Sequence, residues 1–494
     1  MRSTRYDGLT AEGASTTADL EIPAHTAARE RGWPMRPDIK RPTIAPLRSA
    51  PHRQYFPDIP ALVPRHGLYQ GEPETCRRDL RSFLPILSHL GLMLAVFKVY
   101  HIEGRAFQML VALALVALPL HYLLPLRWKK PCFSAVSIVG LFLVFGPAAA
   151  ACILALGSVY IGLCYAPVAW RYRAALVAGL TVALALLRPR AGDWSVPATV
   201  WPIVASMFMF RMIVLLYELK HAKAREPLAD VVSYFFVLPN LCFTIFPVVD
   251  YRTMQRGFFA QDVHAIQRRG LRMMFWGTVH LLLYREIRHE FLIPAEDVHD
   301  FASLSSYLVC NYLRYLHVSG QFHIACGMLH LFGFQLPETH HFYLLATGFT
   351  DYWRRINIYW KDFMVRVVFN PVVFRLKRWP QPAALAVATV AVFVTTWALH
   401  AYQSFWLKED WRLSVPDALF WAILGALVLV NVQFDARRRR VKATSGGAEW
   451  SARLGLVRVA KTAGTFVTIV LLWSLWDSPS VGDWLDLLRR GLGV

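Results

Sequence analysis

Residues 107–126 read FQMLVALALVALPLHYLLPL, a run without Asp, Glu, Lys or Arg. A helix rises about 1.5 Å per residue, so about 20 apolar residues are needed to cross about 30 Å of hydrocarbon. The apolar residues are continuous rather than alternating, and in lipid only helices and closed barrels satisfy their backbone hydrogen bonds. The stretch therefore predicts a transmembrane helix.

Similar runs recur from Phe83 almost to the end of the 494-residue chain, with charged residues clustered between them. The composition agrees, since 55% of the residues are hydrophobic and the mean hydropathy is +0.36. The candidate spans are 83–102, 107–126, 132–148, 150–169, 173–187, 197–217, 230–248, 271–290, 304–332, 382–405, 416–433 and 462–476. We predict an all-α polytopic membrane protein with about 10–12 transmembrane helices.

Two stretches, 249–272 and 338–380, combine charges with aromatic residues and do not fit simple spans. At membrane depth such segments are tolerated only where protein buries them or where they line a water-filled cavity. We expect re-entrant or interfacial helices there. Residues 482–492 carry leucines together with Trp484, which suggests an amphipathic helix on the membrane surface.

The ends of the chain differ from its middle. The first 75 residues hold ten prolines and lack the apolar core that a signal peptide needs, so we expect a polar, largely irregular tail. The chain then divides into N-terminal transmembrane helices (76–199), a membrane region with the candidate site (200–435), and a segment with a basic loop, a terminal span and the amphipathic helix (436–494). Basic residues lie on alternate loops. This pattern predicts that the tail, Arg437–Arg440 and the loops with Lys129, Arg171 and Lys220 are cytoplasmic, and that Lys408–Asp410 and the loop with Arg188 lie outside.

The formal net charge of +20 raises the question of a nucleic-acid partner. A nucleic-acid-binding protein carries its Lys and Arg on a soluble face. Here they lie largely at the ends of apolar runs, where retention in the cytoplasm explains them, so we expect no nucleic acid. The seven cysteines include no CxxC pair, and no HExxH, GxSxG or GxxxxGK[ST] motif occurs. We therefore expect no metal site, and a serine hydrolase or P-loop enzyme is unsupported.

The segment DYWRRINIYWKD, residues 351–362, is a candidate binding surface. In one continuous helix Trp353, Asn357 and Trp360 would share a face, and Arg354, Arg355 and Lys361 would cluster beside it. Such a surface could bind the anionic part of a cofactor while its aromatic rings shape an acyl channel. The alternative is an interfacial helix with Trp, Tyr and Arg at headgroup level, which is a common arrangement.

His400 ends the apolar run FVTTWALH, residues 393–400. An ionisable group in a membrane segment is a functional-site hypothesis, because its burial there is expensive. An imidazole also exchanges a proton near neutral pH. The alternative is a histidine at the membrane interface that bonds a backbone carbonyl.

Four stretches follow one another in the second half of the chain: FRMIVLLYELK at 210–220, YFFVLPNLCFTIFPVVDY at 234–251, GQFHIACGMLHLFGFQLPE at 320–338 leading into DYWRRINIYWKDF, and TWALHAYQSFW at 396–406. In this order they resemble the membrane-bound O-acyltransferase family, especially its bacterial branch of alginate O-acetylation and teichoic-acid D-alanylation proteins. The resemblance covers residues 200–435. It implies helices and interfacial segments around a tunnel between the two membrane faces.

The resemblance also implies roles for individual residues. His400 would be the catalytic base, and Asn357, where many members have His and others Asn, would donate a hydrogen bond to the developing oxyanion. The remaining candidates for donor or substrate binding are Trp353, Arg354, Arg355, Trp360, Lys361 and His323, which stands where an Asp is common.

The family implies the reactants as well. The donor would be an acyl-CoA or acyl-carrier thioester from the cytoplasm, with no bound cofactor. The acceptor would be a hydroxyl of a cell-envelope glycan or an intermediate carrier, with an extracytoplasmic acyl-accepting protein or polysaccharide as partner, at a bacterial plasma membrane. Two other readings stay open: a transporter or flippase whose polar groups line a path, and an inactive homologue that serves as a membrane scaffold.

Overall fold

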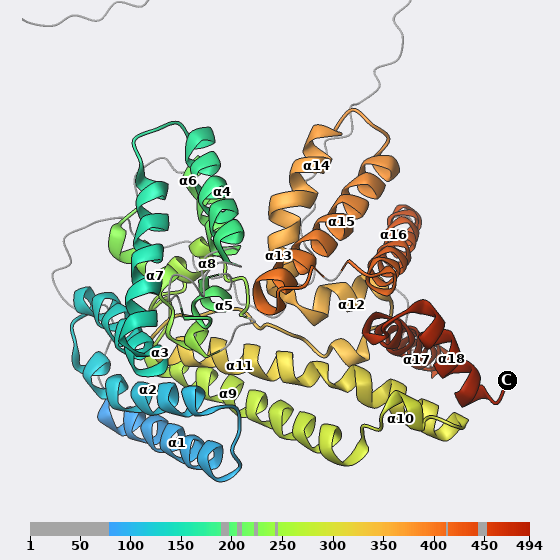
Figure 1. Ribbon diagram of the computed structural model, residues 1–494, viewed down its shortest axis with the longest axis horizontal. Coiled ribbons are helices and arrows are strands. Elements are labelled where there is room, and N and C mark those ends of the chain that lie inside the picture. Colours follow the sequence, from blue (N-terminus) through green and yellow to red (C-terminus); the bar gives the residue numbers. More distant parts are fainter. Residues whose placement is uncertain are drawn as a thin grey trace, which may run out of the picture. The chain divides into compact units, whose positions relative to one another are not determined.

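The computed structural model describes residues 79–188, 197–204, 210–221, 226–242, 246–411, 413–442 and 452–494. These residues belong to one compact unit, Leu62–Val494, and the predicted tail at 1–75 lies outside them. Across these ranges the secondary structure is helical, and an isolated bridge between Phe258 and Phe334 is the single extended pairing. The predicted all-α architecture is confirmed (Figure 1).

Seven helices of the described residues are long and apolar enough to cross a membrane, so the chain is a multi-pass membrane protein. They are α1 (Leu80–Val99), α2 (Arg105–Leu123), α3 (Leu126–Tyr165), α4 (Trp170–Leu187), α15 (Gln381–Lys408) and most of α16 (Val415–Lys442) and α17 (Ala452–Asp477). This number is lower than the predicted count. One reason is that α3 counts once, although it comprises two helices on either side of Gly146 that correspond to the spans predicted at 132–148 and 150–169. A kink at Gly146, where φ is +75°, is followed by Pro147 and bends the chain between them.

Other predicted spans become shorter helices. The run at 197–217 gives α5 (Val200–Val204) and α6 (Phe210–His221), with residues between them outside the described part. The run at 230–248 gives α7 (Leu228–Phe235) and the 3₁₀ turn η5 (Leu238–Leu241). The run at 304–332 is divided into α10 (Phe301–Leu313) and α11 (Tyr315–Leu331), because Arg314 interrupts it and pairs with Asp477 at 2.9 Å. The predictions of single spans at 230–248 and 304–332 were wrong, and the prediction at 197–217 falls partly outside the described residues.

Helices α9 (Val263–Glu286) and α11 lie side by side and antiparallel (Figure 1). Glycines form the seam between them. A Cβ added to Gly277 of α9 would lie 2.7 Å from the carbonyl oxygen of Gly320, and one added to Gly327 would lie 2.6 Å from that of Gly270. Small residues thus let the two backbones approach more closely than side chains would permit.

The charged and aromatic stretch at 338–380 forms short helices, as expected of a segment that does not cross the membrane. They are α12 (Phe349–Ile356), α13 (Ile358–Met364), the π-helical turn η9 (Val365–Phe369) and α14 (Asn370–Arg375). The other such stretch, 249–272, forms α8 (Tyr251–Arg256) and the start of α9.

The C-terminal segment departs from the prediction at one end and agrees with it at the other. Helix α16 continues to Lys442, so the basic loop begins later than predicted and Arg437–Arg440 belong to a helix. The predicted helix at 482–492 is α18 (Val481–Leu492), and its Leu487 is buried against Leu304 of α10.

Candidate functional site

The imidazole of His400, on α15, is half-buried among three tryptophans. Its ring centroid lies 4.8 Å from that of Trp421, 5.4 Å from that of Trp360 and 6.3 Å from that of Trp476. These tryptophans come from α16, α13 and α17. No residue in the described part of the chain forms a hydrogen bond with either ring nitrogen of His400. The backbone bond expected of a merely interfacial histidine is therefore missing among these residues.

Contacts from α12 and α13 hold this aromatic group against α15. The Nε1 of Trp360 donates a hydrogen bond of 3.3 Å to the hydroxyl of Thr396, one turn before His400. The ring of Trp353 lies 4.7 Å from that of Phe393, about two turns before His400. The structure thus brings Trp360 against His400 and Trp353 against Phe393 of the same helix, although these contacts join residues 40 positions apart in the chain.

The prediction of one helix across 351–362 was wrong, because the helix ends and restarts at Asn357. Asn357 has extended dihedrals (φ −141°, ψ 83°), and its Oδ1 accepts the backbone N–H of Trp360 at 3.1 Å as the N-cap of α13. The loop that contains Thr339 hydrogen-bonds to the backbone at this interruption, since Ile358 N–H donates to the Thr339 carbonyl at 2.9 Å. The described residues offer no acceptor to the Nδ2 amide of Asn357, so this donor is available to a ligand.

All three basic residues beside Asn357 have contacts within the chain. Arg355 Nε donates to Asp351 at 2.7 Å, and Lys361 pairs with Asp362. Arg354 is exposed. A role for these three in binding donor phosphates remains a prediction, in which each would exchange an existing contact for the ligand.

His323 lies in a separate histidine cluster formed by α9, α11 and the loop that follows α11. Its ring centroid is 5.3 Å from that of His280 and 5.7 Å from that of His340. Ser319 contacts two of these rings, with its hydroxyl 2.9 Å from His280 Nδ1 and its carbonyl 2.6 Å from His323 Nδ1. Burial holds the pKa of His340 well below its ordinary value, so this ring is neutral. Among the described residues, no group of three or more His, Cys, Asp or Glu side chains is arranged to hold a metal ion.

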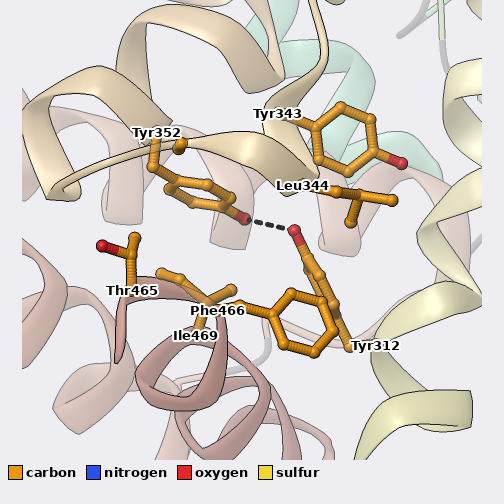
Figure 2. Close-up of a pocket in the computed structure, with 8 residues that line it drawn as sticks. Tyr312, Tyr343, Leu344, Tyr352, Thr465, Phe466 and Ile469 are labelled. Atoms are coloured by element: carbon orange, nitrogen blue, oxygen red, sulfur yellow. Dashed lines mark hydrogen bonds between the residues drawn. The ribbon is translucent and has the colours of Figure 1, made fainter. Parts of the chain in front are cut away.

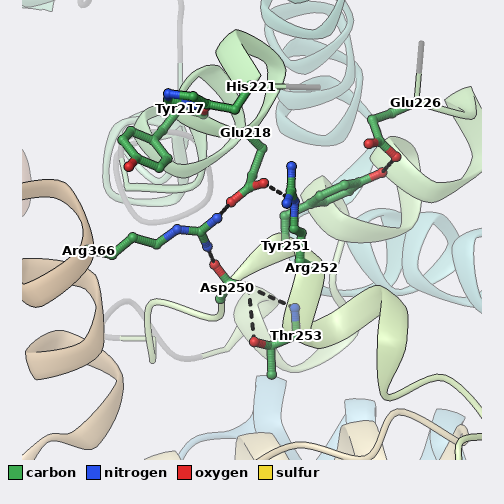
Figure 3. Close-up of polar contacts among 9 residues, drawn as sticks. All are labelled: Tyr217, Glu218, His221, Glu226, Asp250, Tyr251, Arg252, Thr253 and Arg366. Carbon is green, nitrogen blue, oxygen red and sulfur yellow. Dashed lines mark hydrogen bonds and ion pairs between the residues drawn. The ribbon is translucent and has the colours of Figure 1, made fainter. Parts of the chain in front are cut away.

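A cavity of about 250 Å³ lies between α6, α8, α13 and η9. Its polar lining includes Tyr217, Asp250, Asp362 and Arg366. Figure 3 shows the ion pairs at its wall: Arg366 bonds both Glu218 and Asp250, and Arg252 bonds Glu218 as well. The Glu218 side chain is only 2% exposed, so its charge depends on both arginines. Arg366 lies on a π-helical turn, a feature that is frequent at functional sites.

Aromatic side chains connect this cavity to His400. Phe363 lines the cavity, and its ring centroid lies 5.7 Å from that of Trp360, which in turn contacts His400. Phe210 of α6 packs edge-on against Trp360 at 5.1 Å. The indole of Trp360 therefore lies between the cavity wall and the imidazole.

Arg366 and Asp250 were not predicted as site residues, although Asp250 lies in the stretch 234–251 and Arg366 follows the stretch 351–363. No local pattern marks them, because Asp250 and Arg366 are 116 residues apart and meet only in the folded chain.

A second recess is a packed seam rather than a binding site. Figure 2 shows Tyr312, Tyr343 and Tyr352 facing Thr465, Phe466 and Ile469 of α17. The hydroxyls of Tyr312 and Tyr352 lie 3.5 Å apart, and the recess leaves no room for a water molecule. These contacts pack α17 against α10 and α12.

The sequence matches no protein-family model and no curated protein.

Proposed function

We propose that this protein is a membrane-bound O-acyltransferase in which His400 is the general base. The observation that carries the proposal is the half-buried imidazole whose ring nitrogens have no hydrogen-bond partner among the described residues. A general base must be free to accept a proton from its substrate, and such a base typically contributes about 10²–10⁴-fold to the rate. The three surrounding indoles pack against the ring and support its position.

Asn357 supplies the second group that acyl transfer needs. Its Oδ1 is occupied by the cap of α13, which leaves the Nδ2 amide to donate a hydrogen bond to the thioester oxygen as negative charge develops there. An amide cannot act as a base near neutral pH, so the two residues have distinct roles.

The donor is an acyl-CoA or acyl-carrier thioester from the cytoplasm, and no bound cofactor is required. The cavity beside Arg366 supports this route, because it lies at the end of α6 that leads to Lys220, a basic residue that the charge pattern assigns to the cytoplasm. The acceptor is a hydroxyl of a cell-envelope glycan or an intermediate carrier, reached from the opposite face. The protein would lie in a bacterial plasma membrane with its N-terminus in the cytoplasm.

The test is acyl transfer in native membranes, which supply the acceptor themselves. Radiolabelled acetyl-CoA is added to membranes that contain the parent or the H400A variant, and label in alkali-labile esters is counted. H89A is the matched control, since His89 is exposed on α1. We expect H400A to lose at least about 10²-fold of the label and H89A to stay near the parent. Near-normal transfer by well-expressed H400A, or no ester from the parent with several acyl-CoA lengths, would overturn the proposal.

A further inference from the structure

The carboxylate of Asp417 is buried between three helices. It lies in the first turn of α16, its residue is 5% exposed, and it accepts hydrogen bonds from two indoles. Trp397 Nε1 of α15 donates to Oδ2 at 2.6 Å, and Trp476 Nε1 of α17 donates to Oδ1 at 2.5 Å. A carboxylate is expensive to bury, and these short charge-assisted bonds offset part of that cost. The orientation of both indoles is thus tied to one buried side chain.

One of these indoles contacts the candidate base. Trp476 packs edge-on against His400 at 6.3 Å and against Trp421 at 6.0 Å. Trp421 follows Asp417 by one turn of α16 and lies 4.8 Å from His400. The other indole, Trp397, binds the same carboxylate but has no ring contact with His400 within the described ranges.

We propose that Asp417 is a positioning residue for His400 and acts through the indole of Trp476. This inference rests on the proposed acyl transfer. The His400 ring has no hydrogen bond from the described residues that would set its orientation, so packing against the indoles must set it. Asp417 holds Trp476 directly by a hydrogen bond, and Trp421 lies on the same helix as Asp417. A displacement of about 1 Å at a reacting group can cost about 10²-fold in rate, so the anchoring of Trp476 has a kinetic consequence.

Trp397 and Trp476 form a matched pair for the test. Replacing either with Phe keeps an aromatic ring and removes one hydrogen bond to the same carboxylate. W397F and W476F therefore cause similar losses at Asp417, yet of these two rings only that of Trp476 packs against the imidazole of His400. D417N removes the charge and leaves one acceptor oxygen where two donors converge.

The first readout is kinetic, with acetyl-CoA as donor and native membranes that contain the full-length protein and supply the hydroxyl acceptor. We expect D417N and W476F to lower kcat about tenfold with KM nearly unchanged, and W397F to stay within about twofold of the parent. The double variant D417N/W476F should be no slower than the slower single variant, because both changes interrupt one chain of contacts. Equal loss of kcat in W397F and W476F would overturn the proposal. Asp417 would then serve only to hold α15, α16 and α17 together.

The second readout does not need activity. Diethyl pyrocarbonate modifies imidazoles, and the modification rate at the His400 peptide can be measured by mass spectrometry relative to that at His89. We expect the relative rate to change in D417N and W476F and to remain at the parent value in W397F. If this pattern holds while the parent transfers no acyl group, the proposed function fails and the positioning role stands. An unchanged rate in D417N and W476F would overturn the positioning role whatever the activity.

Discussion

The indole nitrogen of Trp360 donates a hydrogen bond to the hydroxyl of Thr396, which joins α13 to α15 one turn before His400. Thr396 is fully buried, so T396V removes the acceptor with little change in shape and leaves the indole N–H without it. We expect a loss of about 1–3 kcal/mol in stability and a lower kcat, measured by thermal unfolding and acyl transfer. T389V is the control, because the Thr389 hydroxyl donates to Leu385 on its own helix. Equal effects of the two variants would contradict the importance of the bond between α13 and α15.

Asn357 has two functions that substitutions can separate. N357D keeps a side-chain oxygen for the N-cap of α13 but removes the amide donor, whereas N357A removes both. We expect N357D to unfold near the parent temperature and to lose about 10²–10³-fold in turnover. N357A should lose similar activity and in addition about 1 kcal/mol of stability. Parental turnover in N357D would reduce Asn357 to a helix cap.

Glu218 connects Arg252 and Arg366 at the wall of the cavity. E218Q removes the buried charge and leaves both guanidinium groups without their shared carboxylate. Both arginines are about one-third exposed, so we expect a moderate destabilisation of about 1–3 kcal/mol in chemical unfolding. D486N is the control, since the Arg489–Asp486 pair is exposed on α18 and should contribute little. A stability of E218Q equal to that of the parent would show that solvent already screens the network.

The topology can be tested with single cysteines in a background without the native ones. Arg188 pairs with Glu409 at 3.3 Å, so the ends of α4 and α15 lie on the same side of the protein, as the charge pattern requires. We expect a cysteine at Asp410 to react with an impermeant thiol reagent from outside, and cysteines at Lys220 and Arg437 to react only from the cytoplasm. Labelling after detergent treatment controls for reactivity. Reaction of Asp410 and Lys220 variants from the same face would contradict the orientation.

The sequence by itself determined the membrane class and most of the long spans, and it predicts the residue at the centre of the candidate site. Runs such as 107–126 are sufficient for this, because lipid penalises every charge and every unpaired backbone group locally, and this penalty can be calculated residue by residue. His400 was found for the same reason, as an ionisable group within an apolar run.

Only the tertiary structure decided where helices stop and which polar groups meet. The pattern of 351–362 suits one helix, yet the helix is interrupted at Asn357. There the backbone N–H of Ile358 donates to the Thr339 carbonyl, which lies outside the helix. The pairs Asp417–Trp476 and Asp250–Arg366 likewise join residues far apart in the chain. Such contacts depend on the packing of whole helices, and the packing depends on side chains such as the glycines between α9 and α11 that have no local signature.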